Sequence, residues 1–114
     1  MNHPNIIYKI CSSDEWEAAV RLGHFSGSPV DVSDGFIHFS TADQMKETAA
    51  KHFAGQADLV LVAIDTNQLG EHLKWEPSRG GDLFPHLYGK LQTTAAVNVQ
   101  PLPLASDGTH QFPD

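Results

Sequence analysis

Two histidine-containing segments hold most of the side chains in this sequence that can do chemistry. In the first, GFIHFST, His38 stands shortly before Ser40 and Thr41. Histidine exchanges protons near neutral pH, and backbone amides at a helix start attract phosphate or carboxylate groups. Because Ser40 or Thr41 can cap a helix, the segment predicts an anion or ribose site beside a helix start. The structural alternative is that His38 only satisfies a hydrogen bond beneath a loop.

The second segment, KWEPSRGGDLFPHLYG, carries more functional side chains than a plain connection usually does. Glu76 can accept hydrogen bonds from hydroxyls or act as a base, Arg79 can pair with a phosphate, and His86 can exchange a proton. Tyr88 can stack on a ring. The structural alternative assigns Glu76 and Arg79 to a solvated ion pair and Tyr88 to the core. The candidate catalytic residues are His38, Glu76 and His86.

Local sequence signals predict the elements that must position these segments. Residues 6–11 (IIYKIC) predict a first strand, because β-branched and aromatic side chains favour strands. Ser12 and Glu15 have the spacing of a capping box, so a helix should follow and end at Gly23. Residues 58–65 (DLVLVAID) form a nearly continuous apolar run, which predicts a central strand buried on both faces.

The first histidine segment lies between these elements. Residues 23–35 are rich in Gly, Ser, Pro and Asp and predict an irregular surface loop. Residues 36–40 predict a strand that turns His38 and Ile37 to opposite faces. A helix should follow this strand directly and end at about Ala54.

The remaining sequence predicts short strands and a second loop. Residues 73–77 (LKWEP) predict a strand, residues 78–86 a mobile loop, and residues 87–91 and 95–102 two further strands. These elements make an α+β fold with two small, mainly antiparallel sheets packed with two or three helices around one core. Residues 1–114 are few enough to form a single domain.

Charge and composition exclude several classes of function. Fourteen acidic and seven basic residues give a formal net charge of −7, which repels nucleic acids and anionic membranes. No segment approaches about 18 consecutive apolar residues, and the first residues lack the pattern of a secretion signal. The single cysteine, Cys11, cannot form an internal disulfide. We therefore expect a cytoplasmic protein with neither a nucleic acid nor a membrane as partner.

A metal site is the weaker alternative for the histidines. His38 and His86, with Glu76 or His72, are side chains that can share a metal ion. The sequence contains no tight metal-binding spacing such as HExxH, so we assign no metal ligand.

Several segments together resemble one bacterial family. The stretches YKICSSDEW, DGFIHFSTADQ, DLVLVAID and LKWEPSRGGDLFPHLYG are similar to the family catalogued as domain of unknown function 952. The resemblance covers roughly residues 6–103. That family is similar in pattern to the ADP-ribosyltransferase-like superfamily, a split β fold that binds nicotinamide adenine dinucleotide (NAD) between two short sheets.

This second resemblance implies roles for residues of both histidine segments. It puts Tyr8 and Lys9 on the ligand-binding first strand, with Lys9 at the place of a histidine or arginine that contacts ribose. It puts His38 at the second motif and the late glutamate position near His86. NAD is the implied cofactor. The candidate ligand-binding residues are then Tyr8, Lys9, Ser40, Thr41, Arg79 and Tyr88.

Two classes of function remain open. The first is binding of NAD or an ADP-ribose-like nucleotide, with ADP-ribosyl transfer or glycohydrolase chemistry. The second is a non-catalytic small-ligand sensor or protein-interaction domain with an apolar rim of Phe25, Phe84 and Leu87, acting as a monomer or weak homodimer. A two-histidine phosphoesterase is a lesser alternative, because its histidine-x-serine motif occurs at His38 and is not repeated at His86.

Overall fold

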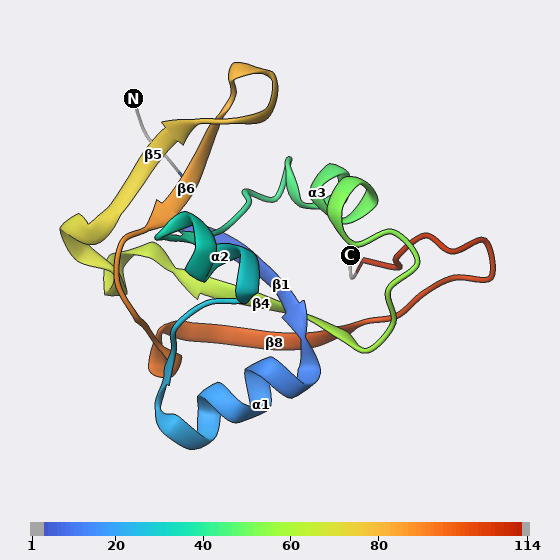
Figure 1. Ribbon diagram of the computed structural model, residues 1–114, viewed down its shortest axis with the longest axis horizontal. Helices are drawn as coiled ribbons and strands as arrows, with labels where there is room; N and C mark the ends of the chain where they lie inside the picture. Colours follow the sequence, from blue (N-terminus) through green and yellow to red (C-terminus); the bar gives the residue numbers. More distant parts are fainter. Residues whose placement is uncertain (1–3, 113–114) are drawn as a thin grey trace.

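Three antiparallel sheets and three α-helices make up the fold in the computed structural model, which describes residues 4–112 except the side chain of Arg79 (Figure 1). The strands are β1 (Ile6–Ser12), β2 (His24–Phe25), β3 (Ile37–His38), β4 (Leu59–Asp65), β5 (Leu73–Pro77), β6 (Leu83–Leu87), β7 (Leu91–Gln92) and β8 (Ala96–Leu102). The α-helices are α1 (Ser13–Leu22), α2 (Pro29–Asp34) and α3 (Met45–His52). The α+β class is confirmed, but the described residues form three sheets where the sequence predicted two.

The central sheet has the strand order β1-β4-β8, so β4 pairs on both sides. Successive side chains of a strand point to opposite faces. Leu59 and Leu61 therefore pack on the α3 side, whereas Val62 and Ile64 pack on the α1 side. The prediction of a central strand buried on both faces is confirmed.

Helix α1 follows β1 through the predicted capping box. The Glu15 amide donates to the Ser12 hydroxyl, and the Ser12 amide donates to the Glu15 carboxylate. Gly23 ends the helix at φ 89°, a left-handed conformation that costs glycine little. Trp16 and Ala19 are the buried residues of α1 and pack on one face of the central sheet.

The predicted surface loop at residues 23–35 is wrong. It contains β2, which pairs with β7, and the six-residue helix α2. The local cause is a helix start that the loop interpretation overlooked. Pro29 occupies the first helical position, and the Ser28 amide donates to the Asp31 carboxylate at 2.9 Å.

The predicted helix start at Ser40 or Thr41 is also wrong, because α3 begins at Met45. Ser40 is instead extended and exchanges two backbone hydrogen bonds with Tyr8 of β1, at 2.8 and 2.9 Å. The Thr41 amide donates to the Gln44 side chain. The pairing of Ser40 with β1 thus overrides its local preference for a helix-capping position.

The predicted loop at residues 78–86 and the strand at residues 87–91 are wrong as well. Strand β6 already includes Phe84, Pro85 and His86, and it lies between β3 and β5. A proline has no amide hydrogen and argues against a central strand. Here the Pro85 carbonyl still accepts from the Phe39 amide at 3.0 Å, so β6 keeps its place. The β5–β6 hairpin projects from the rest of the fold (Figure 1).

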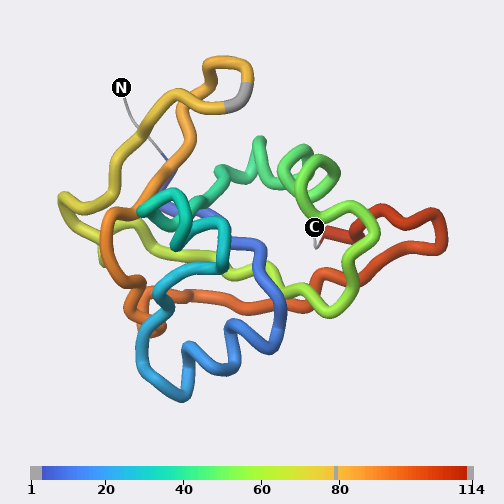
Figure 2. Tube along the Cα trace, viewed as in Figure 1, coloured from blue at the N-terminus to red at the C-terminus, as the bar shows by residue number. Residues whose placement is uncertain are grey.

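The last described segment folds back beside α3. Leu104 and His110 form an isolated antiparallel bridge, and Figure 2 shows the red C-terminal segment returning toward the green helix. Phe112 packs against the α3-side core. No helix within residues 4–112 is both long and apolar enough to cross a membrane.

Candidate functional site

A cavity of about 470 Å³ lies at the edge of β1, between α2, α3 and β6. The bridge between Tyr8 and Ser40 joins β1 to the segment that follows β3, so two sheets meet here. Five predicted site residues line this cavity, which we call the histidine pocket: Tyr8, Lys9, His38, Ser40 and His86.

Lys9 and Asp31 form a buried ion pair at the base of the histidine pocket. Strand alternation turns Lys9 inward, where it is 4% exposed, and Asp31 is 1% exposed. The Lys9 ammonium donates to Asp31 at 2.7 Å and to the His38 carbonyl at 3.0 Å. A buried cation is costly without such partners. The pair therefore ties β1, α2 and β3 together.

Asp31 is the centre of a wider network. Its carboxylate accepts from the backbone amides of Ser28 and His38, from the His38 ring and from Lys9. Burial alone would raise the pKa of this carboxyl, but the His38 hydrogen bond and the Lys9 charge outweigh burial and lower the pKa to about 2. Asp31 is therefore ionised at neutral pH.

Gly27 makes room for this carboxylate. Its φ is +113°, a conformation that other residues rarely adopt, and a Cβ there would lie 2.7 Å from the Cβ of Asp31. Both the positive φ and the close approach of Asp31 therefore favour glycine at position 27.

The His38 ring lies between two carboxylates. Nδ1 faces Asp31 at 2.6 Å, and Nε2 faces Asp34 at 3.0 Å. Nδ1 is hydrogen-bonded to Asp31, and the Nε2 contact with Asp34 is an ion pair when the ring is protonated.

His86 has a different environment, although it pairs with His38 in the register of β3 and β6. Its Nδ1 donates to Glu76 at 2.8 Å, and the Tyr88 hydroxyl donates to the same Glu76 oxygen. The hydrogen bonds from His86 and Tyr88 lower the pKa of Glu76, and the bond to Glu76 raises the pKa of Tyr88.

The second nitrogen of His86, Nε2, lies on the ring edge away from Glu76. Among the described residues, no hydrogen bond joins Nε2 to a partner. The His86 side chain is 6% exposed and lines the cavity. With Nδ1 held by a carboxylate, Nε2 can accept a proton or a hydrogen bond.

Phe36 holds the two histidine rings in place. Its ring stacks on His86 with 4.2 Å between centroids, and lies 4.6 Å from the His38 ring. The two histidine rings are 5.5 Å apart. Phe36 therefore packs on protein rings, and both imidazoles are fixed before any ligand arrives.

Comparison with known proteins identifies the family of this chain. The family model described as "Protein of unknown function (DUF952)" matches residues 10–99. The chain belongs to the DUF952 family. The resemblance to this family found in the sequence is thus confirmed. The match includes the pocket residues from Ile10 to His86, whereas Tyr8 and Lys9 of β1 precede it.

Solved structures of one related protein share the fold. The crystal structure of protein CC0527 from Caulobacter crescentus is 54% identical, with a TM-score of 0.90 over 93% of each chain. Its solution NMR structure is 53% identical, with a TM-score of 0.84 over 95% of this chain and 93% of that one. None of the curated proteins matches this chain.

Three further predicted residues of this DUF952 chain, Thr41, Glu76 and Tyr88, lie outside the lining of the histidine pocket. Glu76 is hydrogen-bonded to His86, and Tyr88, which is 39% exposed, is hydrogen-bonded to Glu76. Thr41 contacts Gln44 through its backbone. The side chain of Arg79 lies outside the described part of the structure.

Sequence reasoning missed the two carboxylates of α2. Asp31 and Asp34 both line the histidine pocket. The signal for Asp31 was present as Ser28-Pro29-x-Asp31, the spacing of a helix N-terminal capping pattern. Asp34 follows three positions later on the same helix, and no motif marked it.

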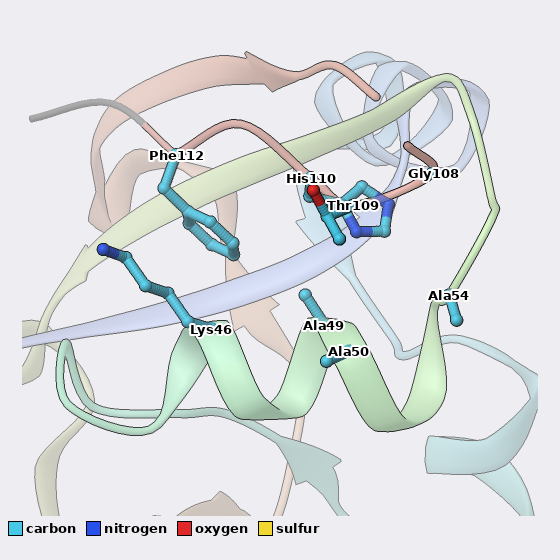
Figure 3. Close-up of a pocket in the computed structure, with 8 residues that line it drawn as sticks. All are labelled: Lys46, Ala49, Ala50, Ala54, Gly108, Thr109, His110 and Phe112. Carbon is cyan, nitrogen blue, oxygen red and sulfur yellow. The ribbon is translucent and has the colours of Figure 1, made fainter. Parts of the chain in front are cut away.

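Two further features carry less chemistry. A cavity of about 400 Å³ between α3 and the C-terminal segment has a floor of alanines, with Phe112 opposite (Figure 3). Cys11 is 1% exposed, and burial raises the pKa of its thiol to about 12, so it is no nucleophile. Among the described residues, no three His, Cys, Asp or Glu side chains are grouped as metal ligands.

Proposed function

We propose that the histidine pocket binds a nucleotide-like ligand of the NAD or ADP-ribose class. The observation that carries the proposal is the pairing of His38 and His86 on neighbouring strands, facing one cavity with Lys9, Ser40 and Tyr8. Its volume of about 470 Å³ falls in the range of about 300–1,000 Å³ common for small-molecule sites. An ADP-ribosyltransferase-like split β fold is part of this proposal, and so is a cytoplasmic location.

The side chains of the pocket complement the parts of such a ligand. The His38 ring, when protonated, favours an anionic phosphate. The Ser40 hydroxyl can bond a ribose hydroxyl, since hydroxyl groups both donate and accept hydrogen bonds. Tyr8 contributes an aromatic wall.

Glycohydrolase chemistry assigns His86 the role of general base. Water attacks the anomeric carbon of the nicotinamide-side ribose and forms the new C–O bond, while its proton passes to His86 Nε2. The C–N bond breaks, and its electron pair leaves with nicotinamide. Glu76 orients the ring through Nδ1, and its negative charge stabilises the protonated His86 that this step forms.

Ligand binding without catalysis is the second candidate, and one observation favours it. The Glu76 oxygen that faces His86 already accepts two hydrogen bonds. A carboxylate engaged in this way stabilises a reacting cation less than a free one would. A small-ligand sensor that works as a monomer or weak homodimer fits this geometry.

Calorimetric titration of the protein with ADP-ribose and with NAD tests the proposal. Binding to the natural chain should be lost in His86→Ala, with folding checked by the melting curve without ligand. His72→Ala is the matched control, because His72 is exposed and lies outside the pocket lining. Equal affinities in the two variants, or no binding at all, would contradict the proposal. Release of nicotinamide from NAD separates the catalytic version from the sensor.

A further inference from the structure

We infer that Asp34 masks a phosphate subsite, in which a phosphate group replaces the Asp34 carboxylate at Nε2 of His38. The inference rests on the proposed function in one respect, because it names where the ligand's phosphate binds. The two carboxylates that contact the His38 ring differ in burial.

Asp31 is a fixed partner of His38, whereas Asp34 is a replaceable one. The Asp31 side chain is fully buried and also holds Lys9 and two backbone amides. The Asp34 side chain is 46% exposed and meets His38 at 3.0 Å. Exposed ion pairs of this kind contribute about 0–1 kcal/mol. The Asp34 side chain can therefore turn away from His38 without breaking the hydrogen bonds of Asp31.

The position of Asp34 in α2 also weakens its contact. It is the last residue of the helix, where the backbone carbonyls carry partial negative charge. A carboxylate is disfavoured at that end. A rotation of this side chain into solvent relieves the repulsion and uncovers the donor Nε2–H.

Charge balance indicates which ligand replaces it. When His38 is protonated, Lys9 and His38 carry two positive charges and Asp31 and Asp34 two negative ones, so the closed site is then neutral. Departure of Asp34 leaves one net positive charge, which suits one phosphate group. The hydroxyls of Ser40 and Thr48 line the same cavity and are hydrogen-bonded to each other at 3.0 Å.

Titration with inorganic phosphate tests the subsite without a nucleotide. Asp34→Ala should bind phosphate about two- to fivefold more tightly than the natural chain, the effect of losing one half-exposed competing ion pair. Glu17→Ala removes the same charge from an exposed position on α1 and should leave the affinity unchanged. Equal affinities in Asp34→Ala and Glu17→Ala would overturn the inference.

A second readout does not depend on variants that could fail to fold. Phosphate added to the natural chain should shift the ring ¹⁵N and ¹H resonances of His38, with the larger change at Nε2. Shifts confined to His110 or to the remaining histidines would overturn the subsite.

A parallel titration with ADP-ribose separates the two possible failures. If ADP-ribose binds but Asp34→Ala changes neither affinity, the subsite is wrong and the pocket proposal stands. If phosphate behaves as expected but ADP-ribose does not bind, the subsite is supported for free phosphate and the nucleotide proposal fails.

Discussion

The two histidines of the pocket face each other across β3 and β6, but they belong to different kinds of surroundings. His38 sits in a buried ionic network that joins β1, α2 and β3. His86 sits on the projecting β5–β6 hairpin, where its partner Glu76 has a side chain 38% exposed. The contrast shows that one cavity is held by a buried ion pair on the His38 side and by a half-exposed carboxylate on the His86 side. The His38 side holds shape and charge, and the His86 side can exchange protons.

Removal of the buried Asp31 carboxylate should have the largest effect on stability. Asp31→Ala leaves Lys9 buried without its anion, so we expect a loss of about 3–5 kcal/mol in the free energy of unfolding. Asp34→Ala is the control and should cost less than about 1 kcal/mol, because the side chain is half-exposed. Urea unfolding measures both. Similar losses in the two variants would show that the His38 side is not built around Asp31.

A crowded glycine should matter more than an open one. Gly27→Ala brings a Cβ to 2.7 Å from Asp31 in addition to a positive φ, and should cost about 2–3 kcal/mol. Gly55→Ala has a φ of +74° and no atom within 4 Å of its new Cβ, and should cost about 1 kcal/mol. Thermal unfolding compares them. A smaller loss at Gly27 than at Gly55 would refute the role of close packing against Asp31.

Acid should affect the His38 side through Asp31. Its pKa is lowered from 3.8 to about 2, so its contribution to stability is fully present above about pH 4. As the pH falls, the unfolded carboxyl binds a proton first, and the contribution is lost by the time the pH passes about 2. Carboxyl ¹³C titration should place the Asp31 midpoint well below 3.8. A midpoint at or above that value would contradict the network.

The smallest expected effect concerns the His86 side. The Glu76 carboxylate raises the pKa of Tyr88 by accepting its hydroxyl proton in a hydrogen bond. Glu76→Gln removes that charge, so the pKa of Tyr88 should fall toward its ordinary value of 10.0. Ultraviolet titration of tyrosine reports the change, with Tyr88→Phe identifying the signal. An unaltered titration in Glu76→Gln would dismiss the Glu76–Tyr88 contact.

The sequence predicted those parts of the fold that depend on local signals. The apolar run of β4 and the Ser12–Glu15 capping box each specify their element within a few residues. The histidine segments were also singled out correctly as neighbours, because His38 and His86 line one cavity. What the sequence could not supply was the partner of each polar side chain.

The errors arise where distant residues override local preference. Ser40 is a good helix cap by type, but its pairing with Tyr8 in β1 keeps it extended. Lys9 and Asp31 are 22 positions apart, and no spacing rule connects them. The β6 strand was missed because a proline in a sequence argues against a central strand. Only the structure shows that the Pro85 carbonyl accepts a hydrogen bond from the Phe39 amide of the neighbouring segment.

Ring ¹H–¹⁵N spectra of the histidines during titration with ADP-ribose show whether this ligand binds in the histidine pocket. We expect the ring resonances of His38 and His86 to shift together, whereas those of His72 and His110 stay in place. His110 lines the cavity beside α3 and therefore reports on the competing location. Shifts at His110 alone, or no shifts at any histidine, would contradict binding in the histidine pocket.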